Sequence, residues 1–220
     1  MPDSSIAYVP RQLPAKDGPI RLAVCISGGG TTLANLLEKI DQGLLTGFEI
    51  SIVISDRSDA KGLEIATSRG IPTAVVHRKD LQMSALIFQK IRSVKADMVV
   101  LGGFLSLLFV PDDYQHRVLN IHPSLIPAFC GRGYFGKAVH KAAIDAGVKF
   151  SGCTVHFADR SYDTGPIIIQ KVVDVLDDDT PDSLAKRVFQ AECEALPEAI
   201  RIVASGNLEQ HGRRMVIKPS

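Results

Sequence analysis

Short apolar runs that alternate with amphipathic stretches constrain the fold of this chain more than any other feature. The first run, residues 22–26, leads into Gly28-Gly29-Gly30, and apolar residues then recur at helical spacing from Leu33 to Leu44. An apolar stripe at this spacing covers one face of a helix. The pattern therefore predicts a strand, a tight turn and a helix in succession.

The same rhythm continues through the first half of the chain. Predicted strands lie at 50–54, 73–76, 98–101 and 118–121, and predicted helices at 60–69 and 81–92. Beyond them, longer strands are expected at 152–157 and 166–175, and a helix from Thr180-Pro181 toward Gly206. Continuous apolar strands that alternate with helices are typical of a parallel sheet covered on both faces. We therefore expect an α/β fold with a mostly parallel, mixed sheet and helices on both faces.

Length and composition favour one domain. A chain of 220 residues with 45% apolar content is long enough to bury one substantial core. We expect a loose leader at 1–20, a domain at 21–206 and a polar tail at 207–220. The first 20 residues contain four prolines and no apolar run typical of a signal peptide. Four scattered cysteines are typical of reduced thiols, so the expected location is the cytoplasm.

The charge balance restricts the partners. The chain has 25 basic and 24 acidic side chains, so no global positive field attracts a nucleic acid. No stretch reaches the roughly 18 apolar residues of a membrane span. A small phosphorylated substrate remains compatible, because backbone amides at a helix N-terminus can bind it. We expect small-molecule partners, no nucleic acid, no membrane, and a monomer or homodimer.

The glycine-rich segment 27–32 joins the first predicted strand to the first helix. Free amides at a helix start can form a phosphate site, so the whole segment is a candidate for one. Two other interpretations remain: a plain tight turn, or a dinucleotide loop. Leu33 occupies the place of the third glycine of the dinucleotide pattern, and no Walker lysine follows.

Asn120 and His122 lie two residues apart at the end of a predicted strand, so their side chains share one face. Strand ends of this kind border the ligand sites of open α/β sheets. Asp163 lies in a turn and is either a turn former or a site residue. Glu192 lies on the apolar stripe of the last helix, where a carboxylate pairs with a core base or binds polar groups of a ligand.

Other chemistries are not indicated. His140 and His156 together with His122 match no familiar zinc spacing, so no metal is expected. His156 lies in an apolar strand, where a hydrogen-bonded core histidine is as plausible as an active one, and we expect it to support the site from behind. No nucleophile elbow is present, and the cysteines have no neighbouring base in sequence.

Three ordered segments, Asn120-Ile121-His122-Pro123-Ser124-Leu125-Ile126-Pro127, Gly152-Cys153-Thr154-Val155-His156-Phe157 and Asp163-Thr164-Gly165-Pro166-Ile167-Ile168, resemble the phosphoribosylglycinamide formyltransferase family. The resemblance covers roughly residues 21–206. It implies a Rossmann-like formyltransferase fold and transfer of a formyl group from 10-formyltetrahydrofolate to the amine of phosphoribosylglycinamide, a step of purine biosynthesis.

The resemblance also implies roles for individual residues. Asn120, His122 and Asp163 correspond to the catalytic group, Gly30, Thr31 and Thr32 to the phosphate contacts, and Glu192 to the ribose contact. A carboxylate beside a histidine stabilises its imidazolium form, so Asp163 is expected to raise the pKa of His122 and let it act as an acid near neutral pH. The folate pocket corresponds to Leu105, Ser106, Leu107 and Leu108, together with Asn120. The chain departs from the family pattern at Ser106 and around Ala85, where arginines are common. Two alternatives are kept: a formyltetrahydrofolate hydrolase and a noncatalytic nucleotide-binding module.

Overall fold

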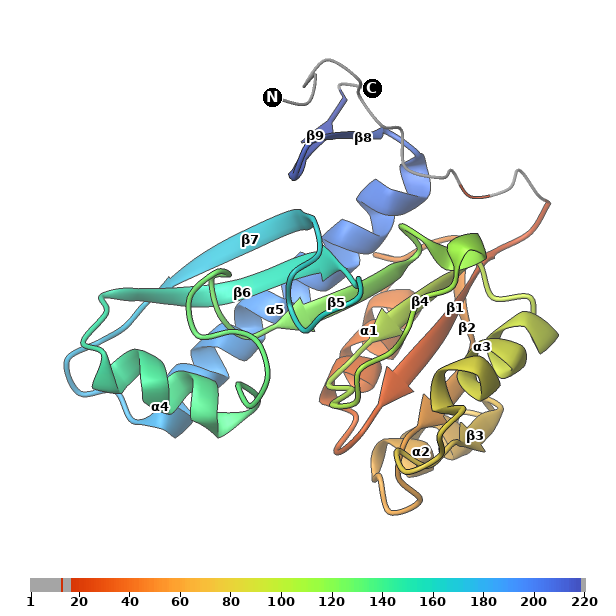
Figure 1. The fold of residues 1–220 in the computed structure, drawn as a ribbon, viewed down its shortest axis with the longest axis horizontal. Helices are drawn as coiled ribbons and strands as arrows, with labels where there is room; N and C mark the ends of the chain where they lie inside the picture. Colours follow the sequence, from red (N-terminus) through yellow and green to blue (C-terminus); the bar gives the residue numbers. More distant parts are fainter. Residues whose placement is uncertain (1–12, 14–16, 219–220) are drawn as a thin grey trace.

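The computed structural model describes residue 13 and residues 17–218 (Figure 1). The helices are α1 (Thr31–Asp41), α2 (Gly62–Ser68), α3 (Met83–Ser93), α4 (Lys137–Asp145) and α5 (Pro181–Ser205), with a short 3-10 turn η1 (Asp112–Tyr114). The strands are β1 (Ile20–Ile26), β2 (Phe48–Ser55), β3 (Thr73–Val75), β4 (Met98–Leu101), β5 (Val118–His122), β6 (Phe150–Phe157), β7 (Ile167–Asp174), β8 (Leu208–His211) and β9 (Arg214–Ile217).

All of these strands form one sheet, in the order β3-β2-β1-β4-β5-β6-β7-β9-β8. The pairs from β3 to β5 are parallel, whereas β6 is antiparallel to both β5 and β7. The expected α/β fold with a mixed sheet is therefore confirmed. Because β5 has a parallel neighbour on one side and an antiparallel neighbour on the other, its carboxyl end lies where the direction of the sheet changes.

Helices cover both faces of the sheet, and β1 shows how one strand serves both cores. Val24 packs in a core cluster with residues of α1 and α5, whereas its neighbour Cys25 packs in a second cluster with residues of α3. Successive side chains of a strand point to opposite faces of the sheet, so a continuous apolar strand contributes side chains to the core on each face. Figure 1 shows α1 and α5 on one side of the sheet and α3 on the other.

The segment expected to be a polar tail belongs in large part to the sheet. Strands β8 and β9 form a hairpin, and β9 pairs with β7 between Arg214 and Ile167. Leu208 is buried in the larger core cluster. Hydrogen bonding along the hairpin accommodates polar residues, which is why composition alone misses it. Most of the expected leader, residues 1–12 and 14–16, lies outside the described residues, and Ile20 already begins β1.

The long helix α5 has clear start and stop signals. The Thr180 side chain accepts a hydrogen bond from the Ser183 amide, Pro181 occupies the first turn, and Gly206 ends the helix with a φ of 72°. The helix continues through Pro197. None of the helices in the described ranges is long and apolar enough to cross a membrane.

Candidate active site

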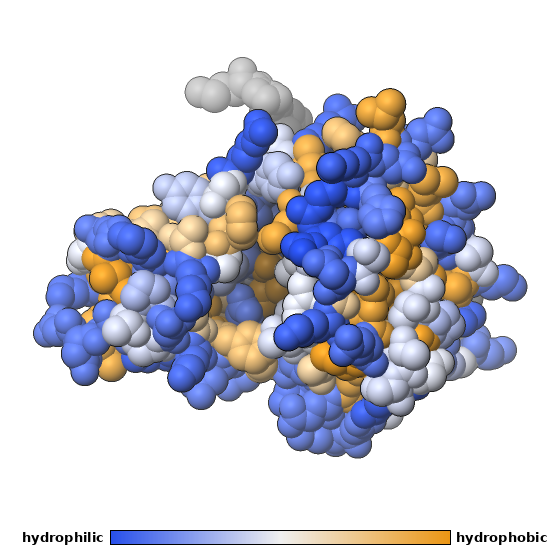
Figure 2. Space-filling model, turned by 90° about the horizontal axis from the view of Figure 1, so that it is seen from below, coloured by the Kyte–Doolittle hydropathy of each residue, from blue (hydrophilic) through white to orange (hydrophobic). Residues whose placement is uncertain are grey.

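A cavity of about 660 Å³ opens at the carboxyl end of β5. The end of β5, the first turn of α1, the segment 103–108, the segment 131–137 and the inner faces of α4 and α5 form its walls. Figure 2 shows the molecule hollowed between its two halves, with apolar surface at the floor of the hollow. The volume suits a small molecule of drug size.

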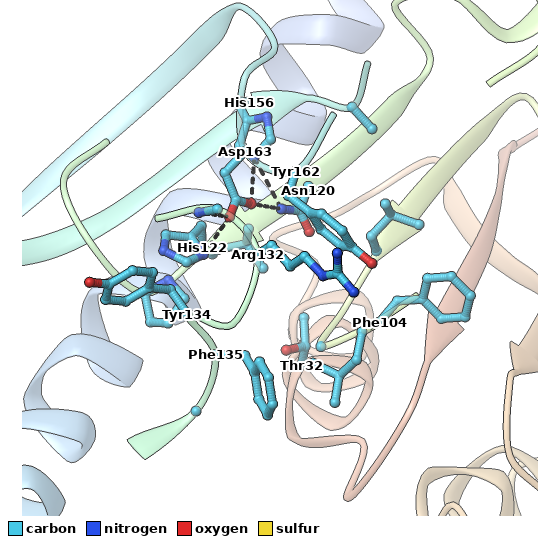
Figure 3. A pocket seen from close by; sticks show the side chains of 18 of the residues that line it. Thr32, Phe104, Asn120, His122, Arg132, Tyr134, Phe135, His156, Tyr162 and Asp163 are labelled. Carbon is cyan, nitrogen blue, oxygen red and sulfur yellow. Dashed lines mark hydrogen bonds and ion pairs between the residues drawn. The ribbon is translucent and has the colours of Figure 1, made fainter. Parts of the chain in front are cut away.

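Asn120, His122 and Asp163 meet at one wall of this cavity. Asp163 Oδ1 accepts a hydrogen bond from Asn120 Nδ2 at 3.2 Å, and Asp163 Oδ2 lies 3.5 Å from His122 Nδ1. Figure 3 shows all three side chains turned toward one another. The two-residue spacing in β5 therefore places both polar side chains on the same face, and the loop 158–165 brings the carboxylate to them.

His156 on β6 supports this group, because it is the direct strand partner of Asn120. His156 Nδ1 lies 2.8 Å from the Phe157 carbonyl oxygen, which can only accept, so this nitrogen carries the proton. The other nitrogen, Nε2, then accepts from Asn120 Nδ2 at 3.0 Å. The Asn120 amide group donates both to His156 and to Asp163, and its orientation is fixed by these two partners.

Asp163 is both a turn residue and a site residue, so the two interpretations of the sequence do not exclude each other. Its φ of 56° lies in the left-handed region, which aspartate tolerates better than most residues. Gly131 N donates to Oδ2 at 2.8 Å. Burial alone would raise the pKa of Asp163, but contacts with His156, His122 and the Gly131 amide outweigh it and lower this pKa. The carboxylate is therefore ionised at neutral pH.

His122 is buried and held at both ring nitrogens. Nε2 donates to the Phe129 carbonyl oxygen at 2.9 Å, and Nδ1 faces Asp163. Burial lowers the pKa of His122, and the Asp163 charge offsets only part of this effect. The expectation that the carboxylate raises the pKa of His122 above its ordinary value is thus wrong in net sign for the ligand-free chain, because desolvation is the larger effect.

Residues of the glycine-rich segment 27–32 have different positions relative to the cavity. Thr31 and Thr32 line the cavity. No side chain in the described part of the chain caps the start of α1, so its first amides have no side-chain acceptor there. Gly30 does not line the cavity. Its φ is 75°, and a Cβ there would lie 2.6 Å from the Gly62 Cα. Glycine is therefore required at this position for a tight turn and for close packing of α1 against α2.

Glu192 faces the cavity from α5. Burial raises the pKa of its carboxyl group to about 7. Within the described part of the chain, no hydrogen bond or ion pair involves its carboxyl oxygens, so the core-base partner that the sequence left open is not found there. A partly buried carboxyl group without a protein partner is suited to a polar ligand.

The segment expected to form the folate pocket does line the cavity, from Phe104 to Leu108. Ser27 Oγ accepts from the Leu105 amide at 2.8 Å, so this segment is tied to the end of β1. Ser106 Oγ donates to Asp56 Oδ2 at 2.6 Å, and Arg78 pairs with the same oxygen at 3.1 Å. The Ser106 hydroxyl is therefore engaged inside the protein.

Sequence reasoning missed the wall formed by 131–137, which includes Arg132, Tyr134 and Phe135. The only signal was the run of glycines at 131, 133 and 136, all of which have positive φ. His140, considered only as a metal ligand, also lines the cavity from α4. In the described ranges no group of three or more His, Cys, Asp or Glu side chains has an arrangement that could hold a metal ion. Burial raises the thiol pKa of Cys25 and of Cys153 to about 12.

Comparison with known proteins places this chain in a class of enzymes. The family model described as "Formyl transferase" matches residues 20–200, so the chain belongs to the formyltransferase family. Among its relatives is the phosphoribosylglycinamide formyltransferase of Vigna unguiculata chloroplasts, which is 38% identical over 186 residues. That alignment covers 82% of this chain and 59% of the relative, so the chain spans less than two thirds of the plant protein.

Solved structures show the same likeness. The glycinamide ribonucleotide transformylase 1 of Symbiobacterium toebii has a TM-score of 0.84 at 37% identity, over 95% of this chain and 99% of that one. A formyltetrahydrofolate deformylase of Pseudomonas syringae has a TM-score of 0.81 at 26% identity, over 92% of this chain and 67% of that one. The scaffold is therefore shared by transferases and by a deformylase.

Proposed function

We propose that this chain transfers the formyl group of 10-formyltetrahydrofolate to the amine of phosphoribosylglycinamide, a step of purine biosynthesis. The observation that carries the proposal is the convergence of Asn120, His122 and Asp163 beside a cavity that the first turn of α1 also borders. The similarity to proteins named phosphoribosylglycinamide formyltransferase supports the choice of acceptor.

The reaction needs a proton donor and a hydrogen-bond donor near one carbon atom. Attack by the amine forms a C–N bond and moves the π electrons of the formyl group onto its oxygen. The collapse of this intermediate breaks the bond to folate N10, and the proton lost by the amine is taken up by N10, directly or through water. Groups that stabilise the charged oxygen lower the barrier, and a positioned acid or base assists the proton transfers.

His122 is the proposed proton donor to this oxygen. Its Nε2–H binds the Phe129 carbonyl in the ligand-free chain, so the formyl oxygen takes the place of that acceptor. Asp163 stabilises the imidazolium form from the Nδ1 side. Asn120 donates to the same oxygen once one of its two present acceptors, His156 or Asp163, releases it.

Other walls of the cavity bind the two substrates. The free amides at the start of α1, with Gly30 shaping the turn and Thr31 and Thr32 facing the cavity, hold the phosphate. Glu192 accepts hydrogen bonds from the ribose hydroxyls. The segment Leu105, Ser106, Leu107 and Leu108 binds the pterin through apolar contacts and main-chain groups.

The test is to mix the purified protein with 10-formyltetrahydrofolate, with and without phosphoribosylglycinamide, and to follow tetrahydrofolate release. Release that requires the acceptor and is lost in His122→Ala supports the transferase. Release without acceptor favours a hydrolase, the activity named for the Pseudomonas structure. No release at all would leave only a nucleotide-binding role.

Two further parts of the proposal concern the setting of the enzyme. The cysteines of the described chain are free thiols, which suits a reducing compartment, and we propose the cytoplasm. We propose a monomer or homodimer with small-molecule partners. Cell fractionation and light scattering of the purified chain test these points, and a tetramer or a membrane-bound pool would contradict them.

A further inference from the structure

Arg132 lies between two glycines, in the segment that contacts the catalytic carboxylate. Gly131 and Gly133 each have a φ of 93°, a conformation that favours glycine. The Gly131 amide donates to Asp163 Oδ2 at 2.8 Å, so the backbone next to Arg132 is anchored at the reaction centre. Figure 3 shows the Arg132 side chain extended across the cavity, away from His122 and toward the side where Phe104 and Tyr162 lie.

The charges on the cavity wall single out this side chain. Among the residues that the structure describes, two cationic side chains besides the histidines line the cavity, Arg132 and Lys137. Lys137 Nζ pairs with Asp182 at 2.7 Å. No hydrogen bond or ion pair joins the Arg132 guanidinium to any residue that the structure describes. A guanidinium has five donors in a planar fork that matches a carboxylate or phosphate, so Arg132 is an anion-binding group without an anion in its own chain.

The position of Arg132 favours one of the two anionic substrates. The phosphate of the acceptor already has the free amides at the start of α1, next to Thr31 and Thr32. The formyl-folate ends in a glutamate with two carboxylates, and its aromatic part suits the apolar wall that contains Phe104 and Leu105. Arg132 extends toward that wall (Figure 3).

We propose that Arg132 binds a carboxylate of the glutamyl tail of the folate co-substrate. This inference rests on the proposed function, since it requires a folate in the cavity. The interaction fixes the tail of the folate while the formyl group lies at His122. The hydrogen bond from the Gly131 amide to Asp163 joins the segment that carries the tail contact to the loop that carries the catalytic carboxylate.

The test compares tetrahydrofolate with its diamide, in which both tail carboxylates are neutral carboxamides, by anaerobic titration calorimetry. For a partly exposed charge pair we expect the wild type to bind tetrahydrofolate about fivefold to tenfold more tightly. Arg132→Gln should remove this preference, and Arg132→Lys should retain part of it because the charge stays. Arg160→Gln is the matched control, since Arg160 is exposed in the neighbouring loop but does not line the cavity.

The outcomes separate this inference from the proposed function. An undiminished preference in Arg132→Gln would overturn the inference and leave the proposed function intact. A variant that loses affinity for phosphoribosylglycinamide instead would also overturn it and assign the cation to the phosphate. A wild type that binds neither folate would overturn both. Raised salt should weaken the preference of the wild type and leave that of Arg132→Gln unchanged.

Discussion

Replacement of Asp163 by asparagine tests the proposed mechanism most directly. The side chain keeps its size and can still accept from the Gly131 amide, but the negative charge 3.5 Å from His122 Nδ1 is lost. At an effective dielectric constant of about 20, two unit charges at this distance attract by roughly 5 kcal/mol, which is an upper limit. Opposite charges this close shift a pKa by about 1–3 units in practice.

The expected result follows from that range. If the transition state requires the imidazolium form of His122, then Asp163→Asn should lower kcat by about 100-fold, the middle of a 1–3 unit range. The pKa of His122 is already lowered by burial, and loss of the carboxylate lowers it further. The limb of the pH–rate profile that reports this group should therefore move to lower pH in the variant.

The assay is tetrahydrofolate release under saturating substrates across a pH series, with circular dichroism to verify folding. Asp145→Asn serves as control, because Asp145 is an exposed carboxylate on α4 that pairs with Lys141. A fall in kcat of less than about threefold, or an unshifted pH profile, would refute the role of the Asp163 charge, since it corresponds to less than ~1 kcal/mol.

Three further predictions concern stability. Glu192 has a folded-state pKa of about 7 against 4.5 unfolded, so its contribution to folding stability is fully present below pH 4.5 and is lost as pH rises through 7. At pH 8, Glu192→Gln should therefore raise the free energy of unfolding in urea by about 1–3 kcal/mol over the wild type. An equal increase at pH 4 would contradict this cause. Gly30→Ala should cost about 3 kcal/mol of stability in thermal melts, because Gly30 has a positive φ and an added Cβ would meet Gly62. A Cβ added at Gly29 would meet nothing within 4 Å, so Gly29→Ala should change stability by less than about 1 kcal/mol. Equal costs for the two variants would refute the packing argument. Thr180→Ala removes the cap of α5 and should cost about 1 kcal/mol in the same melts, and no change would show that the cap is dispensable.

Regular strands explain why much of the site could be predicted from the sequence. Asn120 and His122 lie in a five-residue strand with a two-residue side-chain period, so their shared face followed from spacing alone. Glu192 lies in a long helix whose apolar stripe points inward, so its direction also followed from spacing. The α/β class followed from the same periodicity.

Irregular segments explain what the sequence did not reveal. The path of 123–136 depends on residues with positive φ, such as Phe129 and Gly131, and no periodicity encodes it. Arg132 and the Phe129 contact with His122 were therefore missed. The net sign of the His122 pKa shift was wrong because burial depends on the whole surrounding fold, whereas the Asp163 charge is only one neighbour.

The hydrogen bond from the Gly131 amide to Asp163 has a thermodynamic consequence. The amide favours the ionised carboxylate, and that carboxylate in turn favours a protonated His122. Formation of the hydrogen bond by the segment 131–136 and proton uptake by His122 are therefore linked equilibria, and each changes the equilibrium constant of the other by the same factor. A ligand that holds this segment in place makes the imidazole more basic without touching it, so proton affinity at the reaction centre reports how the cavity is filled.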